Sequence, residues 1–123
     1  MTCINDTRKP PAQIDPRPVR ELREVLGAAA VRDVLAKFTA DAAVRLAAID
    51  AAVAAHRIAE LRDQLHTLKS TSATLGLVGL AGLAHALEAE ADRIRVDAAR
   101  VGALRALLDA SIAALAASFP DLM

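Results

Sequence analysis

Apolar residues recur at a spacing of three and four positions along almost the whole chain from Val19 to Phe119. A helix turns by about 100° per residue, so residues at this spacing lie on one side of it and form an apolar stripe. Alanine and leucine dominate the composition, aromatic residues make up 2% of it, and β-branched residues are few. The sequence therefore predicts an all-α chain whose helices bury their stripes against one another.

Glycine, proline and one aspartate divide this pattern into segments. Gly27 ends or bends the first helix, Gly76 is expected to stop a later one in the left-handed conformation, and Pro120 closes the last. Between residues 54 and 57 there is neither glycine nor proline, so the break there is inferred from a change of phase alone. The expected helices are a short one starting near Asp15 and Pro18, then about 28–54, 57–75 and 78–95, and a last one capped by Asp97.

Each predicted helix has one stripe that we expect to be buried. The stripes are Val19, Leu22 and Leu26; Val31, Val34, Leu35, Phe38, Ala42, Leu46, Ile49 and Val53; Ile58, Leu61, Leu65, Leu68, Ser72 and Leu75; Leu80, Leu83, Leu87, Ala91 and Ile94; and Val101, Leu104, Leu108, Ile112, Leu115 and Phe119. Short connections favour antiparallel neighbours, so residues 18–120 are predicted to form an antiparallel up-down four-helix bundle with a short additional N-terminal helix. Residues 1–17 contain three prolines and have no apolar period, which predicts a flexible tail or linker.

Charge and composition exclude several classes of partner. The formal net charge is zero, no basic stripe occurs and aromatic residues are scarce, so we expect no nucleic-acid binding. The uncharged run 70–87 has the length of a membrane span, but its polar residues and three glycines favour two short soluble helices. The single Cys3 cannot form an internal disulfide, and the amino terminus lacks an apolar signal core. A cytoplasmic monomer without membrane contact is expected.

One histidine lies on the wrong side of its helix to belong to the core. His66 points roughly 140° away from the mean direction of the buried stripe, together with Arg62 and Asp63, and is predicted to face water. Lys69 follows at i+3, so its ammonium can reach the space in front of the imidazole. Ser70 and Ala73 lie one and two turns further on and are small, which leaves the ring open to a large partner.

The residues His66-Thr67-Leu68-Lys69, followed by small and polar residues and Gly76, resemble the signature of the histidine-containing phosphotransfer (HPt) domain. The resemblance covers roughly Val19 to Phe119. It implies that His66 accepts a phosphoryl group from the phosphoaspartate of a receiver domain, or from a kinase, and passes it to the receiver of a response regulator. It also implies that Lys69 offsets the phosphoryl charge. The chain would be a phosphocarrier rather than an enzyme, since no glycine-rich nucleotide loop occurs.

A second polar set lies on the fourth predicted helix, where His85 and Glu88 share one face. The family resemblance implies that Glu88 binds the proximal ring nitrogen of His66 and so orients it. With His85 as a further member, the set is similar to the phosphotransfer domain of chemotaxis histidine kinases. In the alternative reading, Glu88 pairs with Arg93 or Arg95, and Lys69 is an ordinary solvated lysine.

No cofactor of the chain's own is expected, because the receiver supplies Mg²⁺ in this scheme. The three histidines do not share the i, i+4 spacing of a metal site. Arg62, Asp63, Ser70 and Ala73 form the expected binding surface, although most family members have glycine where Ser70 stands. Two alternatives remain open: a phosphotransfer domain belonging to a larger hybrid or chemotaxis-type kinase, with a hybrid sensor kinase as donor, or a non-catalytic helical module that docks on a receiver or kinase.

Overall fold

The computed structural model describes residues 13–91 and 97–123, and within these ranges all regular structure is helical. The predicted all-α class and the short additional N-terminal helix are confirmed. Five helices are described: α2 (Arg17–Leu26), α3 (Ala28–Ala54), α4 (Ile58–Thr74), α5 (Val78–Glu90) and α6 (Ala98–Ser118).

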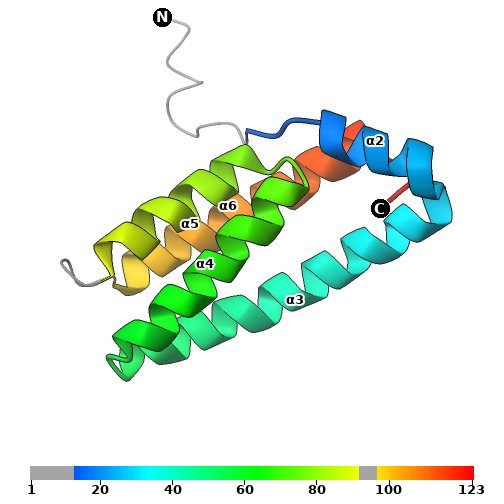
Figure 1. Ribbon diagram of the computed structural model, residues 1–123. Coiled ribbons are helices and arrows are strands. Elements are labelled where there is room, and N and C mark those ends of the chain that lie inside the picture. The colour runs from blue at the N-terminus through cyan, green and yellow to red at the C-terminus, as the bar shows by residue number, and fades with distance from the viewer. Residues whose placement is uncertain (1–12, 92–96) are drawn as a thin grey trace, which may run out of the picture.

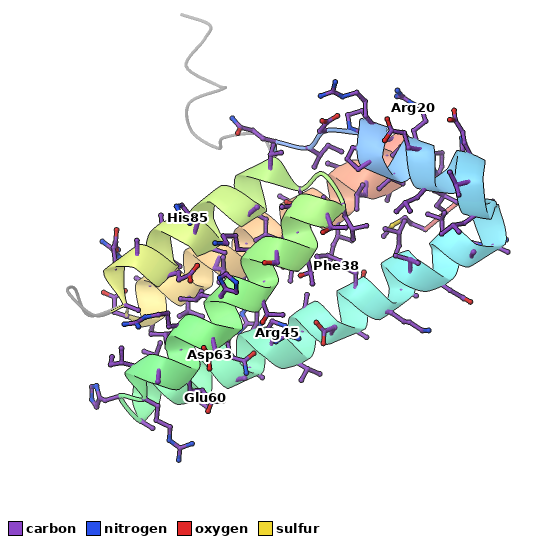
Figure 2. All side chains as sticks on the ribbon, in the orientation of Figure 1. Arg20, Phe38, Arg45, Glu60, Asp63 and His85 are labelled. Atoms are coloured by element: carbon purple, nitrogen blue, oxygen red, sulfur yellow. The ribbon has the colours of Figure 1, made fainter. Side chains whose placement is uncertain are left out.

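The four longer helices form an antiparallel bundle in up-down order (Figure 1). α4 packs between α3 and α5, and α6 closes the ring by packing against both α3 and α5. The short α2 packs against α3 at one end of the bundle. Polar contacts also join α3 to α4, since Arg45 of α3 donates to Gln64 of α4 at 2.9 Å and to Asp41 of its own helix (Figure 2).

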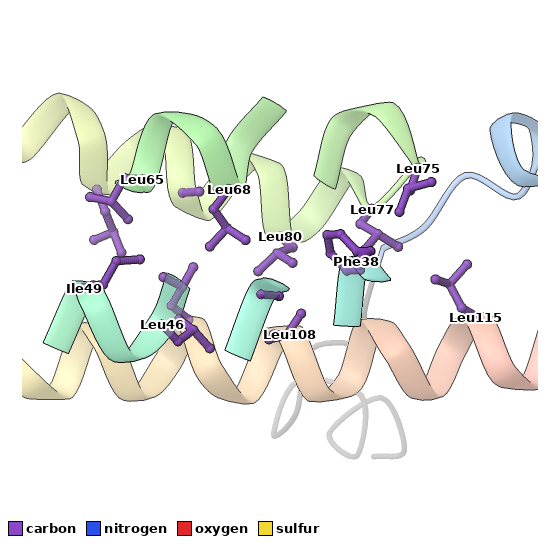
Figure 3. Packing of buried hydrophobic residues seen from close by; sticks show 14 of the residues in the cluster. Phe38, Leu46, Ile49, Leu65, Leu68, Leu75, Leu77, Leu80, Leu108 and Leu115 are labelled. Carbon is purple, nitrogen blue, oxygen red and sulfur yellow. The ribbon is translucent and has the colours of Figure 1, made fainter. Parts of the chain in front are cut away.

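The core lies between the four helices and consists mainly of leucines (Figure 3). Most predicted stripe residues are buried, but Ile58 is 40% exposed and Leu26 50% exposed. Both predictions of burial were wrong, because each residue is at the very end of its helix, where the neighbouring helices no longer cover it. Ile94, predicted to be buried, lies outside the described residues. Five further stripe residues are only partly buried, namely Leu22, Val34, Val53, Leu83 and Ile112.

Gly76 ends α4 as the sequence predicts, with φ +81°. Its N–H donates to the carbonyl of Ala73 at 3.0 Å, and the N–H of Leu77 donates to the carbonyl of Ser72 at 2.9 Å. These two bonds define a Schellman motif, which satisfies carbonyls that the end of a helix would otherwise leave free. α5 begins directly afterwards, so α4 and α5 form a tight helical hairpin.

The turn between α3 and α4, which no glycine or proline marks, is formed by His56. This residue has φ +56°, the one positive value at a residue other than glycine in the described chain. The N–H of His56 donates to Val53 at 3.3 Å and that of Arg57 to Ala52 at 2.9 Å. The turn is therefore a second Schellman motif, with histidine in the position that glycine usually occupies. The imidazole is exposed and takes the role of a turn residue.

We expect His56→Gly to stabilise the fold by about 0.5–1 kcal/mol, because the left-handed region is unfavourable for a residue with a Cβ atom and free for glycine. Urea unfolding of the two proteins measures the difference. Ala55→Gly is the matched control, since Ala55 has φ −94° and gains nothing from glycine. Equal effects of the two changes would contradict the assignment of strain to His56.

Both ends of the described chain are attached to the bundle. Residues 13–17, the last part of the segment expected to be a tail, lie against the α4–α5 turn, with Ile14 partly buried and Arg17 opening α2. Residues 1–12 of that segment lie outside the described residues. After α6, Phe119 and Leu122 are buried, and Asp121 pairs with Arg23 of α2 at 2.8 Å.

α6 is long and apolar enough to cross a membrane by length and composition. The core helix of a bundle passes the same test. In the structure α6 starts at the predicted cap, where the side chain of Asp97 accepts a hydrogen bond from the N–H of Arg100 at 3.0 Å. It packs against α3 and α5 and buries one stripe of Val101, Leu104, Leu108, Ser111 and Leu115.

Candidate functional site

His66 lies in the middle of α4, on the side of the helix that faces away from the core. Its side chain is 59% exposed, whereas the neighbouring stripe residues Leu65 and Leu68 are completely buried. The difference follows from the helical period, because Leu65 and Leu68 belong to the stripe that packs against the other helices. The imidazole is therefore accessible to a molecule that approaches from solvent.

Glu88 of α5 contacts this imidazole directly. Its Oε2 lies 3.1 Å from the Nδ1 atom of His66, which is the ring nitrogen nearer to the backbone. The side chain of Glu88 is 20% exposed, so the carboxylate lies largely within the contact between α4 and α5. Arg93 and Arg95, the alternative partners in the sequence, lie outside the described residues.

The short turn after α4 explains why His66 and Glu88 meet. Each residue is eleven positions from Leu77, one before it and one after it. In an antiparallel hairpin of two helices, residues at equal distances from the turn lie at the same height. Lys69 and His85 are likewise both eight positions from Leu77. The tight turn thus places two pairs of polar residues, one residue of each on α4 and one on α5, at matching heights.

Lys69 completes the contact from the other side of the carboxylate. Its Nζ atom lies 3.4 Å from Oε1 of Glu88, an oxygen that is buried and has no closer hydrogen-bond donor among the described residues. The Lys69 side chain is 28% exposed. From the sequence, this ammonium was expected in front of the imidazole, in one network with His66, His85 and Glu88, but its ion pair with Glu88 was not specified. The count from Leu77 places Lys69 level with His85 and one helical turn from the height of Glu88.

The electrostatics of Glu88 fix the tautomer of the histidine ring. Burial by itself raises the pKa of Glu88, but the bonds from Lys69 and His66 outweigh it and hold the pKa below the ordinary 4.5. Glu88 is therefore a carboxylate at neutral pH and can only accept hydrogen bonds. The Nδ1 atom of a neutral His66 must then carry the proton and donate a hydrogen bond to Glu88. The outer nitrogen, Nε2, is left with a free lone pair.

His66 and Glu88 line a shallow, open hollow of about 330 Å³. It is lined by Arg62, His66 and Lys69 from α4 and by His85, Glu88 and Ala89 from α5. His85 is exposed on α5 (Figure 2), and within the described residues no hydrogen bond joins it to His66. The structure thus brings all four predicted site residues to one hollow, while only His66, Lys69 and Glu88 are in contact.

The four residues predicted to form a binding surface lie on the same helix as His66. Asp63, Ser70 and Ala73 are exposed, and Arg62 is partly buried at the edge of the hollow. Asp63 projects from α4 in Figure 2. Towards the carboxyl end of α4 from His66, the exposed residues Ser70 and Ala73 are small.

The lowered pKa of Glu88 predicts a pH effect on stability. A depressed carboxyl pKa contributes stability above the unfolded value near 4.5, and this contribution is lost as the pH falls through the lower folded value. Thermal unfolding from about pH 6 to about pH 3 should therefore show a steeper loss for the wild type than for Glu88→Gln. The other carboxyl groups titrate in both proteins, so the difference isolates Glu88. Parallel curves would contradict the ionic contacts of Glu88.

No cluster of three or more histidine, cysteine, aspartate or glutamate side chains within residues 13–91 and 97–123 is arranged to hold a metal ion. The family model of the Hpt domain matches residues 33–114, which is more than half of the chain and includes His66, Lys69, His85 and Glu88. No curated protein and no solved structure matched the sequence. Together with the helical bundle, the match shows that the chain belongs to the Hpt domain family.

Proposed function

We propose that this chain carries a phosphoryl group on Nε2 of His66 between the proteins of a phosphorelay. Hpt domains are phosphocarrier modules that perform histidine phosphotransfer and interact with receiver domains and kinases. The observation that carries the assignment to His66 is its contact with Glu88. An exposed imidazole whose inner nitrogen is held by a carboxylate has its outer nitrogen free for attack.

The transfer needs no proton to move during the attack. The Nε2 lone pair forms a bond to phosphorus while the bond from phosphorus to the donor oxygen breaks, and the donor aspartate leaves as a carboxylate. The positive charge that develops on the ring is shared through the Nδ1 proton with Glu88, which remains ionised. In the return step, the aspartate of a second receiver attacks the phosphorus and the imidazole leaves as the neutral ring. Such transfers depend mainly on positioning and on charge stabilisation.

Lys69 is suited to neutralise the oxygens of the transferred group. Its ammonium lies at one edge of the hollow and its partner Oε1 is 3.4 Å away, which is longer than a strong charged hydrogen bond. The flexible four-carbon stem of lysine lets the ammonium turn from Glu88 to a phosphoryl group on the ring. His85 and Arg62 line the same hollow and add positive or polarisable nitrogen groups near that position.

We expect the donor and the acceptor to be receiver domains, which bring their own Mg²⁺ to the reaction. Arg62, Asp63, Ser70 and Ala73 would form the surrounding contact surface on α4. A kinase that transfers directly from ATP to His66 is the alternative donor. We therefore expect the chain to act only together with a partner, which supplies or receives the phosphoryl group.

The test is phosphoryl transfer to the purified chain from a panel of phosphorylated receiver domains and, separately, from histidine kinase cores supplied with ATP. The expected product is a label that is lost in acid and kept in base, as phosphohistidine is, and that maps to His66 by mass spectrometry. A label from receivers alone identifies a relay intermediate, and a label from a kinase core alone identifies a kinase-fed domain. Binding of a receiver without any label from either donor would overturn the proposal in favour of a non-catalytic docking module.

A further inference from the structure

Residues 13–15, which we call the strap, cross the turn between α4 and α5 and bind it through the backbone. The N–H of Asp15 donates to the carbonyl of Gly76 at 2.7 Å, and the N–H of Gly79 donates to the carbonyl of Gln13 at 3.0 Å. The two bonds enclose the turn from both sides, one at the end of α4 and one in the first turn of α5. Ile14, between the bonded residues, is partly buried against the core.

Among the described residues, no side chain caps the start of α5. α5 starts after Leu77 without a side-chain cap, so its first N–H groups need other acceptors. The strap provides one of them, the carbonyl of Gln13, to Gly79. It also provides the N–H of Asp15 to the carbonyl of Gly76, which accepts from the N–H of Val78 at 2.9 Å as well. The strap thus supplies part of the capping that α5 itself lacks.

The contact at Gly76 requires glycine, and the contact at Gly79 leaves little room for a side chain. A Cβ atom at Gly76 would lie 2.2 Å from the carbonyl oxygen of Asp15, and one at Gly79 would lie 3.3 Å from the nitrogen of Gln13. At Gly82 and Gly102, by contrast, a Cβ atom would meet nothing within 4 Å. A Cβ atom would therefore clash with the strap at Gly76 and press against it at Gly79, whereas Gly82 and Gly102 have open space.

The strap holds the part of the hairpin that sets the register of the site. His66 and Glu88 are equally far from Leu77, and their contact of 3.1 Å depends on how α5 is rotated and placed against α4. A shift of α5 by one residue moves its side chains by about 1.5 Å along the helix and about 100° around it. Either displacement would break the bond, because hydrogen bonds weaken steeply with distance and angle.

We propose that the strap is a positioning element of the phosphotransfer site, which fixes the α4–α5 turn and thereby keeps Glu88 on Nδ1 of His66. The inference concerns the resting site and rests on the proposed function only where it predicts a transfer rate. Asp15 and Gln13 act through their backbone atoms, and neither touches the reacting group. When the strap is lost, α5 shifts and Glu88 no longer binds Nδ1 of His66. The proton of the neutral ring is then found on either nitrogen.

Two variants of one residue separate the backbone bond from the side chain. Asp15→Pro removes the N–H that donates to Gly76, whereas Asp15→Ala keeps it and removes only the side-chain bonds to Arg17. We expect the ring ¹⁵N spectrum of unphosphorylated Asp15→Pro to move toward a mixture of the two tautomers. Transfer to His66 should slow by roughly tenfold or more, as for other small displacements of reacting groups. Asp15→Ala should resemble the wild type in both measurements.

Glycine substitutions give an independent pair, in case Asp15→Pro disturbs the start of α2. Gly79→Ala places a methyl group against Gln13, while Gly102→Ala adds the same group to open space on α6. Both changes replace glycine by alanine within a helix, and only the one at Gly79 adds a contact with the strap. Gly79→Ala should shift the ring spectrum, and Gly102→Ala should not.

Amide exchange at Gly79 reports directly whether the strap is attached. If the amide of Gly79 exchanges fast in Asp15→Pro but the His66 spectrum is unchanged, the proposal is overturned. Unchanged exchange at Gly79 in Asp15→Pro would also overturn it. So would equal effects of Asp15→Pro and Asp15→Ala. The ring spectrum is recorded without phosphate. If the ring spectrum shifts in Asp15→Pro but no donor labels the wild-type chain, the proposal for the strap stands and the proposed phosphotransfer is rejected.

Discussion

A chain carrying His66→Gln takes up no acid-labile phosphate from any donor that labels the wild type. Glutamine has no nucleophilic ring nitrogen, so the loss is complete rather than partial. The change should leave the free energy of unfolding within about 0.5 kcal/mol of the wild type, because the His66 side chain is 59% exposed. Labelling after a fixed time, together with urea unfolding of the same samples, measures both effects.

The other two histidines are the natural controls for this experiment. His85→Gln changes a side chain in the same hollow, and His56→Gln changes one in the distant α3–α4 turn. We expect His85→Gln to keep its label, with a slower rate if the imidazole assists the phosphoryl group, and His56→Gln to match the wild type. A full label on His66→Gln, or its loss on His85→Gln alone, would assign the phosphoacceptor to another residue.

Leu68→Ala should destabilise the fold by about 2–5 kcal/mol. Leu68 is completely buried between the helices of the bundle, and its truncation removes apolar contacts and leaves a cavity. A loss of this size is a large part of the stability of a small domain. Urea unfolding followed by circular dichroism gives the difference, and a change below about 1 kcal/mol would contradict the packing of α4.

Lys69→Ala is the matched control for Leu68→Ala, because the two residues are adjacent and point to opposite environments. Lys69 is partly exposed and off the core stripe, so its truncation should change stability much less than that of Leu68. It should slow phosphoryl transfer, since it removes the ammonium that pairs with Glu88 beside the ring. A large drop in the melting temperature with normal transfer would mean that Lys69 serves the fold rather than the site.

The apolar pattern determined most of the fold. Five helices follow from stripes at three- and four-residue spacing, and the breaks at Gly27 and Gly76 and the cap at Asp97 are visible as residue types. The pattern failed at two helix ends, Leu26 and Ile58, because periodicity describes the direction of a side chain and not whether another helix extends far enough to cover it. It placed a break around His56 and made this histidine a turn residue, but it did not predict the left-handed conformation that His56 adopts.

For the site, the exposure of His66 and its spacing to Lys69 follow from one helix, so both are local properties of the sequence. The contact with Glu88 was expected from the family resemblance and not from the helical period. Lys69 was expected in the same network, but not as the ion-pair partner of Glu88. The register of two separate helices decides such contacts, and a few tenths of an ångström in their packing determine which oxygen meets which nitrogen.

The sequence by itself therefore determined which faces of the helices are apolar and which histidine is left in water, because these depend on neighbours within a few residues. The tertiary structure decided which charged groups surround that histidine and which tautomer it adopts. It also decided that residues 13–15, expected to belong to a flexible tail, bind the turn between α4 and α5. These contacts join residues 22 to 66 positions apart, as with Glu88 and His66 or Gln13 and Gly79, and only packing brings them together.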